Sequence, residues 1–165
     1  MPSVEFNVQF SEVELCENGI DSIEFLISAN VGEPPKPIAK IASGGELSRI
    51  MLALKNVLSD KDQIGTMIFD EVDTGVSGRA ATKVAQKLKQ VSSGRQVICV
   101  THLAQLAVLA DNHYLIEKSA KDGKTYTNVT PLDFDGRKYE IARITGGGEI
   151  TETQLKNAEE MLSMQ

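Results

Sequence analysis

The sequence has few of the residues that mark secreted, disulfide-bonded or membrane proteins. It contains no tryptophan, two cysteines and 5% aromatic residues in a chain of 165. Cys99 lies inside an apolar run, so we expect Cys16 and Cys99 to be two buried thiols in a reducing cytosol rather than a disulfide. The chain shows no signal peptide and no apolar run of membrane length. These absences predict a cytoplasmic protein with no membrane partner.

An excess of positive charge is also missing. The formal net charge is -6 and the pI is about 5.0. This overall negative charge argues against binding of nucleic acid or anionic lipid through the charge of the whole chain. A local basic face remains possible. Arg79, Lys83 and Lys87 form a basic stripe on one face of a predicted helix. A solvated surface is the default interpretation of such a stripe, and a DNA contact is the alternative.

The chain also lacks the Gly-x-x-x-x-Gly-Lys-[Ser/Thr] loop that cradles nucleotide phosphates. Gly123-Lys124-Thr125 imitates the end of that loop, but the position of the required first glycine is Lys118. Asp122-Gly123 instead joins two strand-like runs, which is typical of a hairpin turn. Zinc-ligand spacing and a Gly-x-Ser-x-Gly elbow are likewise missing, so neither a zinc site nor a serine hydrolase is indicated.

The order of the predicted elements indicates one α/β domain over residues 1–165. The alternation of Val4, Phe6, Val8 and Phe10, followed by Asn18-Gly19 and an apolar run, predicts an opening β-hairpin. Prolines make 32–37 a predicted loop. A helix is predicted over 46–58, and its expected inward face is Leu47, Ile50, Met51, Leu54 and Leu58.

A βαβ pattern follows. After the loop 59–62, the run 64–69 predicts a parallel strand buried on both faces. The next predicted elements are a helix over 78–91 with Ala81, Val84, Ala85 and Leu88 inward, a strand over 96–100, and a short helix ending near residue 110. This order implies a parallel sheet with right-handed crossovers. A hairpin of runs 113–118 and 125–130 and helices near 137–144 and 151–164 complete the chain.

The segment Ser43-Gly44-Gly45-Glu46 opens the first predicted helix. A serine and two glycines at a helix start present free backbone N–H groups at the positive end of the helix dipole, which suits a phosphate. The alternative is a capping box, in which Ser43 and Glu46 satisfy each other's backbone donors without any ligand. Taken alone, the segment favours the capping box.

Two acids end the first buried strand. Asp70 and Glu71 follow Met67-Ile68-Phe69, and one can hold Mg²⁺ while the other polarises a water. Solvated acids in a loop are the alternative, but adjacent carboxylates repel and are costly without a cation or a basic partner. His102 lies at the tip of the second buried strand, where ligands of open α/β sheets collect. His113 has no such placement and is interpreted as structural.

In combination these motifs resemble those of ABC-type ATPases. Ser43-Gly44-Gly45-Glu46 resembles the signature motif, Ile68-Phe69-Asp70-Glu71 resembles Walker B with its catalytic glutamate, Val72-Asp73-Thr74-Gly75 resembles the D-loop, and His102 resembles the switch histidine. The sequences of segments 41–49 and 70–79 are similar to those of the RecN family, whose members are relatives of the SMC proteins. Ala42 and Glu46 depart from the general ABC pattern and match this branch, which weakens a transporter interpretation.

The resemblance implies a fold and a mechanism. The fold is the C-terminal lobe of a P-loop NTPase of the ABC/SMC head type, a mostly parallel sheet flanked by helices with added β-hairpins. The phosphate loop and a coiled coil would belong to a missing N-terminal part, and Met1-Pro2 would not be the natural start. ATP and Mg²⁺ are the implied cofactors: Asp70 orders Mg²⁺ directly or through a water, Glu71 activates water, and His102 reaches the γ-phosphate.

The resemblance also implies partners. Ser43, Gly44, Gly45 and Glu46 would contact ATP bound to a second head of a homodimer, and Asp73 would couple the two sites. The complete, nucleoid-associated protein would bind DNA and act in double-strand break repair and recombination, while this lobe alone would be inactive. Two other functions stay open: a non-enzymatic partner module, and the nucleotide-binding half of a transporter.

Overall fold

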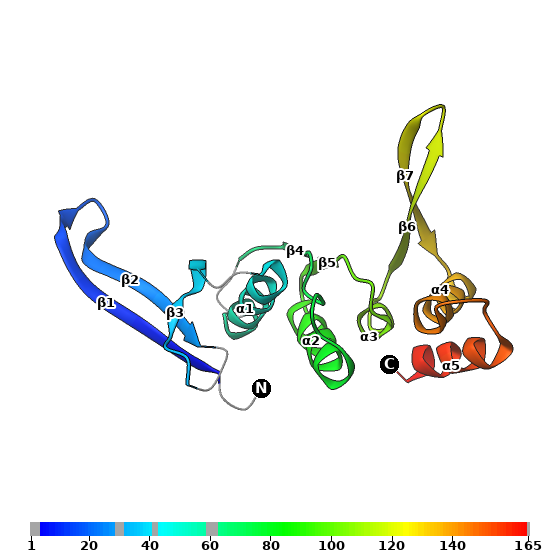
Figure 1. Cartoon of the computed structure of the whole chain (residues 1–165), viewed down its shortest axis with the longest axis horizontal. Coiled ribbons are helices and arrows are strands. Elements are labelled where there is room, and N and C mark those ends of the chain that lie inside the picture. The colour runs from blue at the N-terminus through cyan, green and yellow to red at the C-terminus, as the bar shows by residue number, and fades with distance from the viewer. Residues whose placement is uncertain (1–3, 29–31, 41–42, 59–62, 165) are drawn as a thin grey trace. The chain divides into compact units, whose positions relative to one another are not determined.

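The computed structural model describes residues 4–28, 32–40, 43–58 and 63–164. Ile41-Ala42 of the signature segment, the predicted loop at 59–62 and Met1-Pro2 lie outside the described residues. The chain divides into two compact units, Met1–Leu47 and Ser48–Gln165, whose elements are labelled in Figure 1. The prediction of one domain over 1–165 stays a prediction, and each unit is described by itself.

The first unit is built on the predicted hairpin. β1 (Glu5–Cys16) and β2 (Gly19–Ser28) pair antiparallel, with Phe6 opposite Ile27 and Val8 opposite Phe25. The Phe6 and Phe25 rings stack with centroids 5.8 Å apart. The loop prediction for 32–37 is wrong at its end, because Lys36–Pro37 forms a short strand, β3, beside β2. Proline is tolerated there because β3 is an edge strand. A 3₁₀ turn, Ile38–Lys40, follows.

The second unit contains the predicted βαβ core. β4 (Thr66–Phe69) and β5 (Gln96–Cys99) are parallel and in register, and α2 (Gly78–Val91) connects them. The α2 bounds match the prediction, and its inward residues pack with the buried side chains of β4. This core cluster consists of Leu52, Met67, Phe69, Val72, Ala81, Ala85, Leu88, Val91 and Leu106.

The prediction that β4 is buried on both faces is wrong. Met67 and Phe69 are each 6% exposed, whereas Ile68 between them is 70% exposed. On β5, Ile98 is 44% exposed, and Val100 just beyond that strand is 47% exposed. The helix α2 covers one face of the strand pair, and none of the described elements buries the other. The apolar composition of the strand therefore did not show how many of its faces this chain covers.

The first helix, α1 (Gly44–Val57), exists as predicted but buries a different face. Leu52 is 3% exposed, while Leu47, Met51 and Leu58 are 39%, 42% and 48% exposed. The face with Leu52 also carries Ser48 and Arg49, whose side chains bond to the loop after β4. These polar contacts orient the helix, so the stripe that is most apolar in sequence is not the buried one.

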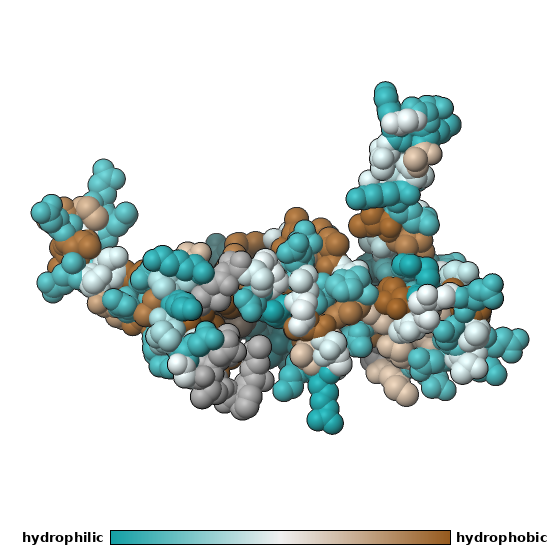
Figure 2. Space-filling model, in the orientation of Figure 1, coloured by the Kyte–Doolittle hydropathy of each residue, from teal (hydrophilic) through white to brown (hydrophobic). Residues whose placement is uncertain are grey.

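A short helix and a second hairpin follow β5. α3 (Ala104–Ala107) leads to β6 (His113–Lys121) and β7 (Lys124–Leu132), which pair antiparallel. Both turn residues have positive φ, 54° for Asp122 and 72° for Gly123, as a two-residue hairpin turn of this type requires. The segment that imitates a phosphate loop is thus a hairpin turn. Figure 2 shows a hydrophilic tip on this hairpin and a hydrophobic band nearer its base.

Two further helices pack on α3. α4 (Phe134–Gly146) ends at Gly147 in the left-handed conformation, and a capping box of Thr151 and Gln154 starts α5 (Glu152–Ser163). Arg137 of α4 donates hydrogen bonds to the carbonyls of Val108 and Ala110 at 3.1 and 2.8 Å. Ile141, Ala142, Ala158 and Leu162 are buried with α3 residues in a second core cluster.

The α/β class is confirmed, and among the described residues its parallel part consists of β4 and β5. The cysteine prediction is half wrong: Cys99 packs against the core, but Cys16 is exposed on β1. Both thiols are free, as expected. Within the part of the chain that the structure describes, no helix has both the length and the apolar composition needed to span a membrane.

Candidate functional site

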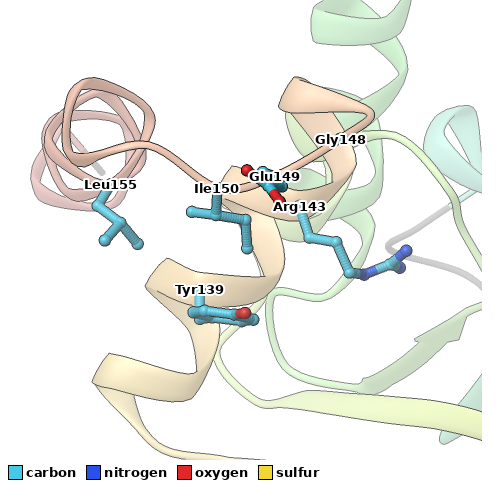
Figure 3. A pocket seen from close by; sticks show the side chains of 6 residues that line it. All are labelled: Tyr139, Arg143, Gly148, Glu149, Ile150 and Leu155. Atoms are coloured by element: carbon cyan, nitrogen blue, oxygen red, sulfur yellow. The ribbon is translucent and has the colours of Figure 1, made fainter.

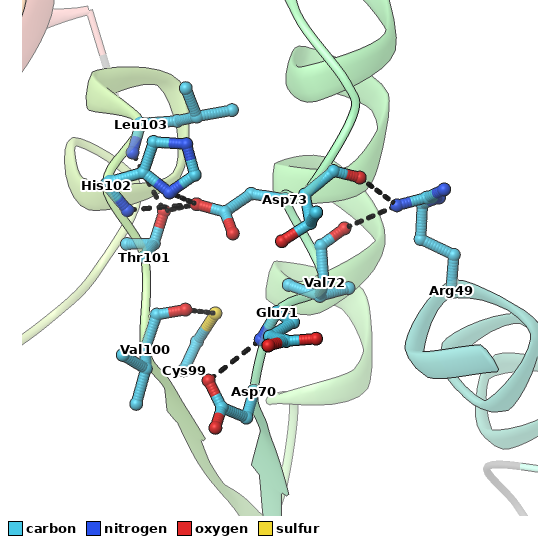
Figure 4. A network of polar contacts seen from close by, with 11 residues as sticks. Arg49, Asp70, Glu71, Val72, Asp73, Cys99, Val100, Thr101, His102 and Leu103 are labelled. Atoms are coloured by element: carbon cyan, nitrogen blue, oxygen red, sulfur yellow. Dashed lines mark hydrogen bonds and ion pairs between the residues drawn. The ribbon is translucent and has the colours of Figure 1, made fainter. Parts of the chain in front are cut away.

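The site lies at one edge of the parallel strand pair. Because β4 and β5 run in the same direction, the segments that leave them, 70–74 and 100–102, emerge at the same edge. The Val100 N–H donates to the Phe69 carbonyl at 3.0 Å, which extends the pairing to the strand ends. Figure 4 shows Asp70, Glu71 and Asp73 following one another on the first segment, with His102 on the second. The fold thus gathers four predicted site residues.

Asp70 and Glu71 are both exposed at this edge. Asp70 Oδ1 accepts a hydrogen bond from the Glu71 N–H at 2.9 Å, and the Ser48 hydroxyl donates to the Asp70 carbonyl at 2.7 Å. Figure 4 shows the two carboxylates pointing in different directions, which reduces the repulsion between them. Two accessible carboxylates on a fixed backbone suit a metal ion on one and a water on the other.

Glu71 has a left-handed backbone, with φ of 56°. This conformation costs a non-glycine residue about 1–2 kcal/mol, and such strain is concentrated at functional sites. No sequence pattern predicted it, because glutamate has no preference for this region. The left-handed backbone of Glu71 is an observation independent of the motif, although Asp122 shows nearly the same φ, 54°, in a hairpin turn.

Asp73 is buried, at 2% exposure, and joins the two strand ends. Its Oδ2 accepts hydrogen bonds from the Thr101 hydroxyl at 2.5 Å and from the His102 N–H at 2.9 Å. The same oxygen lies 3.2 Å from His102 Nδ1. The His102 side chain is itself 72% exposed, so one end of the ring is held while most of it faces solvent (Figure 4).

Two contributors were missed in the sequence. Thr101 links Asp73 to the start of α3, since its hydroxyl also accepts from the Leu103 N–H at 3.0 Å. Arg49 of α1 donates to the Val72 and Thr74 carbonyls at 3.3 and 2.7 Å. In the sequence, Thr101 could be noticed only as a hydroxyl residue immediately before the histidine at a strand end, and Arg49 only as an arginine within an apolar helical stretch. Such patterns are common, so neither identifies a site residue without the fold.

The Cys99 thiol lies near this site and stays protonated. Burial, and then the negative charges of Asp73 and Asp70, raise its pKa to about 12. Because the thiolate is the nucleophilic form of cysteine, this shift disfavours Cys99 as a nucleophile near neutral pH.

The signature segment belongs to the first unit. α1 begins at Gly44, and the Ser43 carbonyl accepts from the N–H groups of Glu46 and Leu47 at 3.0 and 3.2 Å. The Ser43 hydroxyl also accepts from the Glu46 N–H, at 3.4 Å, which is one of the two hydrogen bonds of the capping box that the alternative interpretation describes. The amides of Gly44 and Gly45 have no acceptor inside the helix.

Metal binding at Asp70 remains a prediction. No group of three or more His, Cys, Asp or Glu side chains within the described ranges could hold an ion by itself. Mg²⁺ does not require such a cluster, because protein sites bind it through one or two carboxylates together with substrate phosphates and waters. Asp70, an exposed carboxylate at a strand end, is suited to this kind of site.

Two other features lie outside the site. An open pocket of about 560 Å³ lies between α4 and α5 and is lined by Tyr139, Arg143, Gly148, Glu149, Ile150 and Leu155 (Figure 3). It contains none of the predicted site residues. On α2, Arg79 and Lys83 are exposed, while Lys87 donates to Gln90 and Asn56. The exposure of Arg79 and Lys83 is compatible with the default interpretation of a solvated surface, and the alternative of a DNA contact stays untested.

Comparison with solved structures supports the fold. The Smc head domain from Pyrococcus yayanosii, solved with a coiled coil and joint, matches 90% of this chain and 26% of its own, with a TM-score of 0.63 and 22% identity. The Smc head domain from Pyrococcus furiosus matches 79% of this chain and 31% of its own, with a TM-score of 0.54 and 23% identity. The chain thus has the fold of a part of SMC heads.

Comparison with curated sequences gives the family. No protein-family model matches the chain. The DNA repair protein RecN of Bacillus subtilis is 51% identical over 91% of this chain, and that of Halalkalibacterium halodurans is 46% identical over 99%. The chain spans 26% and 30% of the lengths of these relatives, respectively. With an SMC-head fold and this identity over nearly its whole length, the chain belongs, as a segment, to the RecN family.

Proposed function

We propose that this chain is the C-terminal lobe of an ATPase head and that it supplies the water-activating carboxylate of a nucleotide site. The observation that carries the proposal is the shared edge of β4 and β5: exposed Asp70 and Glu71 follow one strand, and His102, which contacts buried Asp73, follows the other. ATP hydrolysis and action in DNA double-strand break repair and recombination belong to the complete protein that contains such a lobe.

Each group at the edge has a distinct role in this proposal. Glu71 accepts a proton from the attacking water, a task that general bases perform at this kind of position. His102 lies beside the γ-phosphate, where its ring donates to a phosphate oxygen when Nε2 is protonated and accepts from the attacking water when Nε2 is bare. Asp70 holds Mg²⁺, which neutralises charge on the phosphates when it is bound. The triphosphate itself would be held by backbone amides and a lysine of another segment.

The signature segment would act on a second nucleotide. The capped start of α1 presents the Gly44 and Gly45 amides and the Ser43 hydroxyl, and these donors suit the γ-phosphate of ATP bound to another head. Hydrolysis would remove the charge that these donors bind, and the two heads would separate. In this scheme ATP binding joins two heads of a homodimer, and hydrolysis releases them.

Reconstitution tests the proposal. This chain is mixed with a separately produced N-terminal portion of the same RecN-type protein, and phosphate release is measured. We expect turnover in the mixture and little in either part alone, because each part holds half of the catalytic groups. The variant Lys124→Ala is the control for the segment that imitates a phosphate loop. Because Lys124 lies in a hairpin, the mixture with this variant should turn over ATP as the mixture with the unmodified chain does. Unaided turnover by this chain, or none in the mixture while both parts are folded and bound, would contradict the proposal.

A further inference from the structure

One carboxylate of the site is buried and has no route to solvent-borne ligands. Asp73 is 2% exposed, while Asp70 and Glu71 beside it are exposed. A buried carboxylate is costly unless hydrogen bonds compensate for the lost water. Asp73 Oδ2 accepts hydrogen bonds from the Thr101 hydroxyl and the His102 backbone N–H, and His102 Nδ1 lies 3.2 Å from the same oxygen. These contacts suit a residue that acts on its neighbours better than one that contacts a nucleotide.

The contact between Asp73 and the imidazole fixes where the ring proton lies. His102 Nδ1 lies 3.2 Å from Asp73 Oδ2. An ionised carboxylate can only accept hydrogen bonds, so it favours a proton on Nδ1 over a bare Nδ1 lone pair. The hydrogen bond at one ring nitrogen decides which tautomer a histidine adopts. The backbone N–H of the same residue is also bound to Asp73, at 2.9 Å. Asp73 therefore restrains both the main chain and the ring of His102.

We propose that Asp73 is the positioning residue of His102: it holds the proton on Nδ1 and leaves Nε2 as the free end of the ring at the site. This inference deepens the proposed function and rests on it, because it assigns the state in which His102 meets the γ-phosphate. It gives Asp73 a role within its own subunit, in place of the coupling role between two heads that the family resemblance implies.

The neighbouring contacts make the arrangement specific. Thr101 donates to Asp73 and accepts from the Leu103 N–H, so the carboxylate is also tied to the start of α3. Removal of the Thr101 hydroxyl takes one donor away from Asp73 but leaves the Nδ1 contact in place. Removal of the Asp73 carboxylate takes away the Nδ1 acceptor. Comparing a Thr101 substitution with an Asp73 substitution therefore separates a general disturbance of the contacts around Asp73 from loss of control over the His102 tautomer.

Nuclear magnetic resonance of this 165-residue chain tests the inference without nucleotide. Long-range ¹H–¹⁵N spectra distinguish protonated from bare imidazole nitrogens, and His113→Gln assigns the signals, since the chain has two histidines. Spectra are recorded near pH 8.5, about two units above the ordinary histidine pKa of about 6.5. We expect the His102 proton on Nδ1 in the unmodified chain and in Thr101→Val, and a mixture of tautomers in Asp73→Ala.

Several results would overturn the inference. They are a proton predominantly on Nε2 in the unmodified chain, an unchanged tautomer in folded Asp73→Ala, and a change in Thr101→Val as large as in Asp73→Ala. The spectrum of the unmodified chain needs no substitution, so a failure of Asp73→Ala to fold leaves a decisive measurement. The readout also does not depend on ATP turnover. If reconstitution fails and the proton lies on Nδ1, the proposed function is rejected and the role of Asp73 at the His102 ring is kept. If reconstitution succeeds and the proton lies on Nε2, the proposed function is kept and the role of Asp73 is rejected.

Discussion

At the scale of single residues, the proposed mechanism depends most on Glu71. It is exposed, its backbone is left-handed with φ of 56°, and it follows a strand whose register is fixed by pairing with β5. The sequence identified this residue from the motif and the apolar run before it. The strain could not be read from the sequence, because it comes from the turn that the rest of the fold imposes on segment 70–75.

We predict that Glu71→Gln in the complete protein lowers ATP turnover by about 10²–10⁴-fold, the usual contribution of a general base. ATP binding should persist, because glutamine keeps the shape of glutamate and the phosphates are held elsewhere, and ATP-bound head dimers should last longer. Phosphate release and light scattering measure the two effects. Glu149→Gln, at the pocket between α4 and α5, is the control and should behave like the unmodified protein. Normal turnover in Glu71→Gln would refute the assigned role.

The two cysteines should differ sharply in reactivity. Cys16 is exposed on β1, whereas burial and the charges of Asp73 and Asp70 raise the pKa of Cys99 to about 12. Near pH 8 the folded chain should therefore be alkylated by iodoacetamide at Cys16 and not at Cys99. In denaturant both should react. Mass spectrometry of the peptides reports the two sites, and rapid labelling of Cys99 in the folded chain would show that this edge of the core is open.

At the scale of elements, α1 shows why its existence was predictable and its orientation was not. Its apolar periodicity predicted a helix, and the helix is there. The buried face, however, is set by Ser48 and Arg49, which reach carbonyls more than 20 positions away in sequence. Polar side chains that orient a helix through long-range contacts leave no periodic signal. The same reason explains why Arg49 and Thr101 were missed at the site.

We predict that Arg49→Met lowers the free energy of unfolding of this chain by about 1–2 kcal/mol, because the Val72 and Thr74 carbonyls lose a charged donor. Methionine keeps the length and much of the apolar stem of arginine. Arg79→Met on the exposed face of α2 is the matched control and should change stability by less than about 0.5 kcal/mol. Urea unfolding measures both. Equal effects of the two substitutions would mean that Arg49 does not hold the loop after β4.

The junction of β6 with α4 should make stability depend on pH. Burial, and then the positive charge of Arg137, lower the pKa of His113, against a smaller opposite effect of Glu140. The Nδ1 atom of His113 is buried without a hydrogen-bond partner among the described residues. The unfolded chain therefore binds a proton first, and the free energy of unfolding should fall as the pH drops below about 6.5.

Substitution separates His113 from other titrating groups. In His113→Gln the fall in stability just below pH 6.5 should be smaller, because a glutamine does not titrate. Thr127→Gln, on the exposed part of β7, serves as the control and should retain the fall, because neither side chain titrates. Urea titrations across this pH range measure the effect. A fall that persists unchanged in His113→Gln would exclude this histidine as its source.

At the scale of the whole molecule, the order of the elements and the class of fold were predicted well from the sequence, and the burial of individual side chains was predicted less well. Strand pairs, α2 and the second hairpin were predicted from alternation, periodicity and turn residues, which are local signals. Exposure of Ile68, Met51 and Cys16 depends on which faces this chain covers, and local composition does not contain that information. The positions of the candidate site residues at strand ends were predictable from their spacing, while the contacts around Asp73 required the folded chain.

The central claim is that two heads share each nucleotide site, one through Glu71 and the other through the segment that begins at Ser43. Neither of the complete proteins Ser43→Arg and Glu71→Gln should turn over ATP as a homodimer. In a mixed dimer, however, one site combines the intact Glu71 of the first protein with the intact Ser43 of the second. The other site carries both defects. Mixing the two inactive proteins should therefore restore activity.

Steady-state ATP turnover of an equimolar mixture of complete Ser43→Arg and Glu71→Gln proteins tests this claim most directly. Random pairing gives mixed dimers in half of the population, each with one working site, so we predict about a quarter of the turnover of the unmodified protein. Each variant mixed with unmodified protein shows that the subunits exchange. If exchange occurs and the mixture is no more active than the sum of its two components, the sites are not shared and the account is wrong.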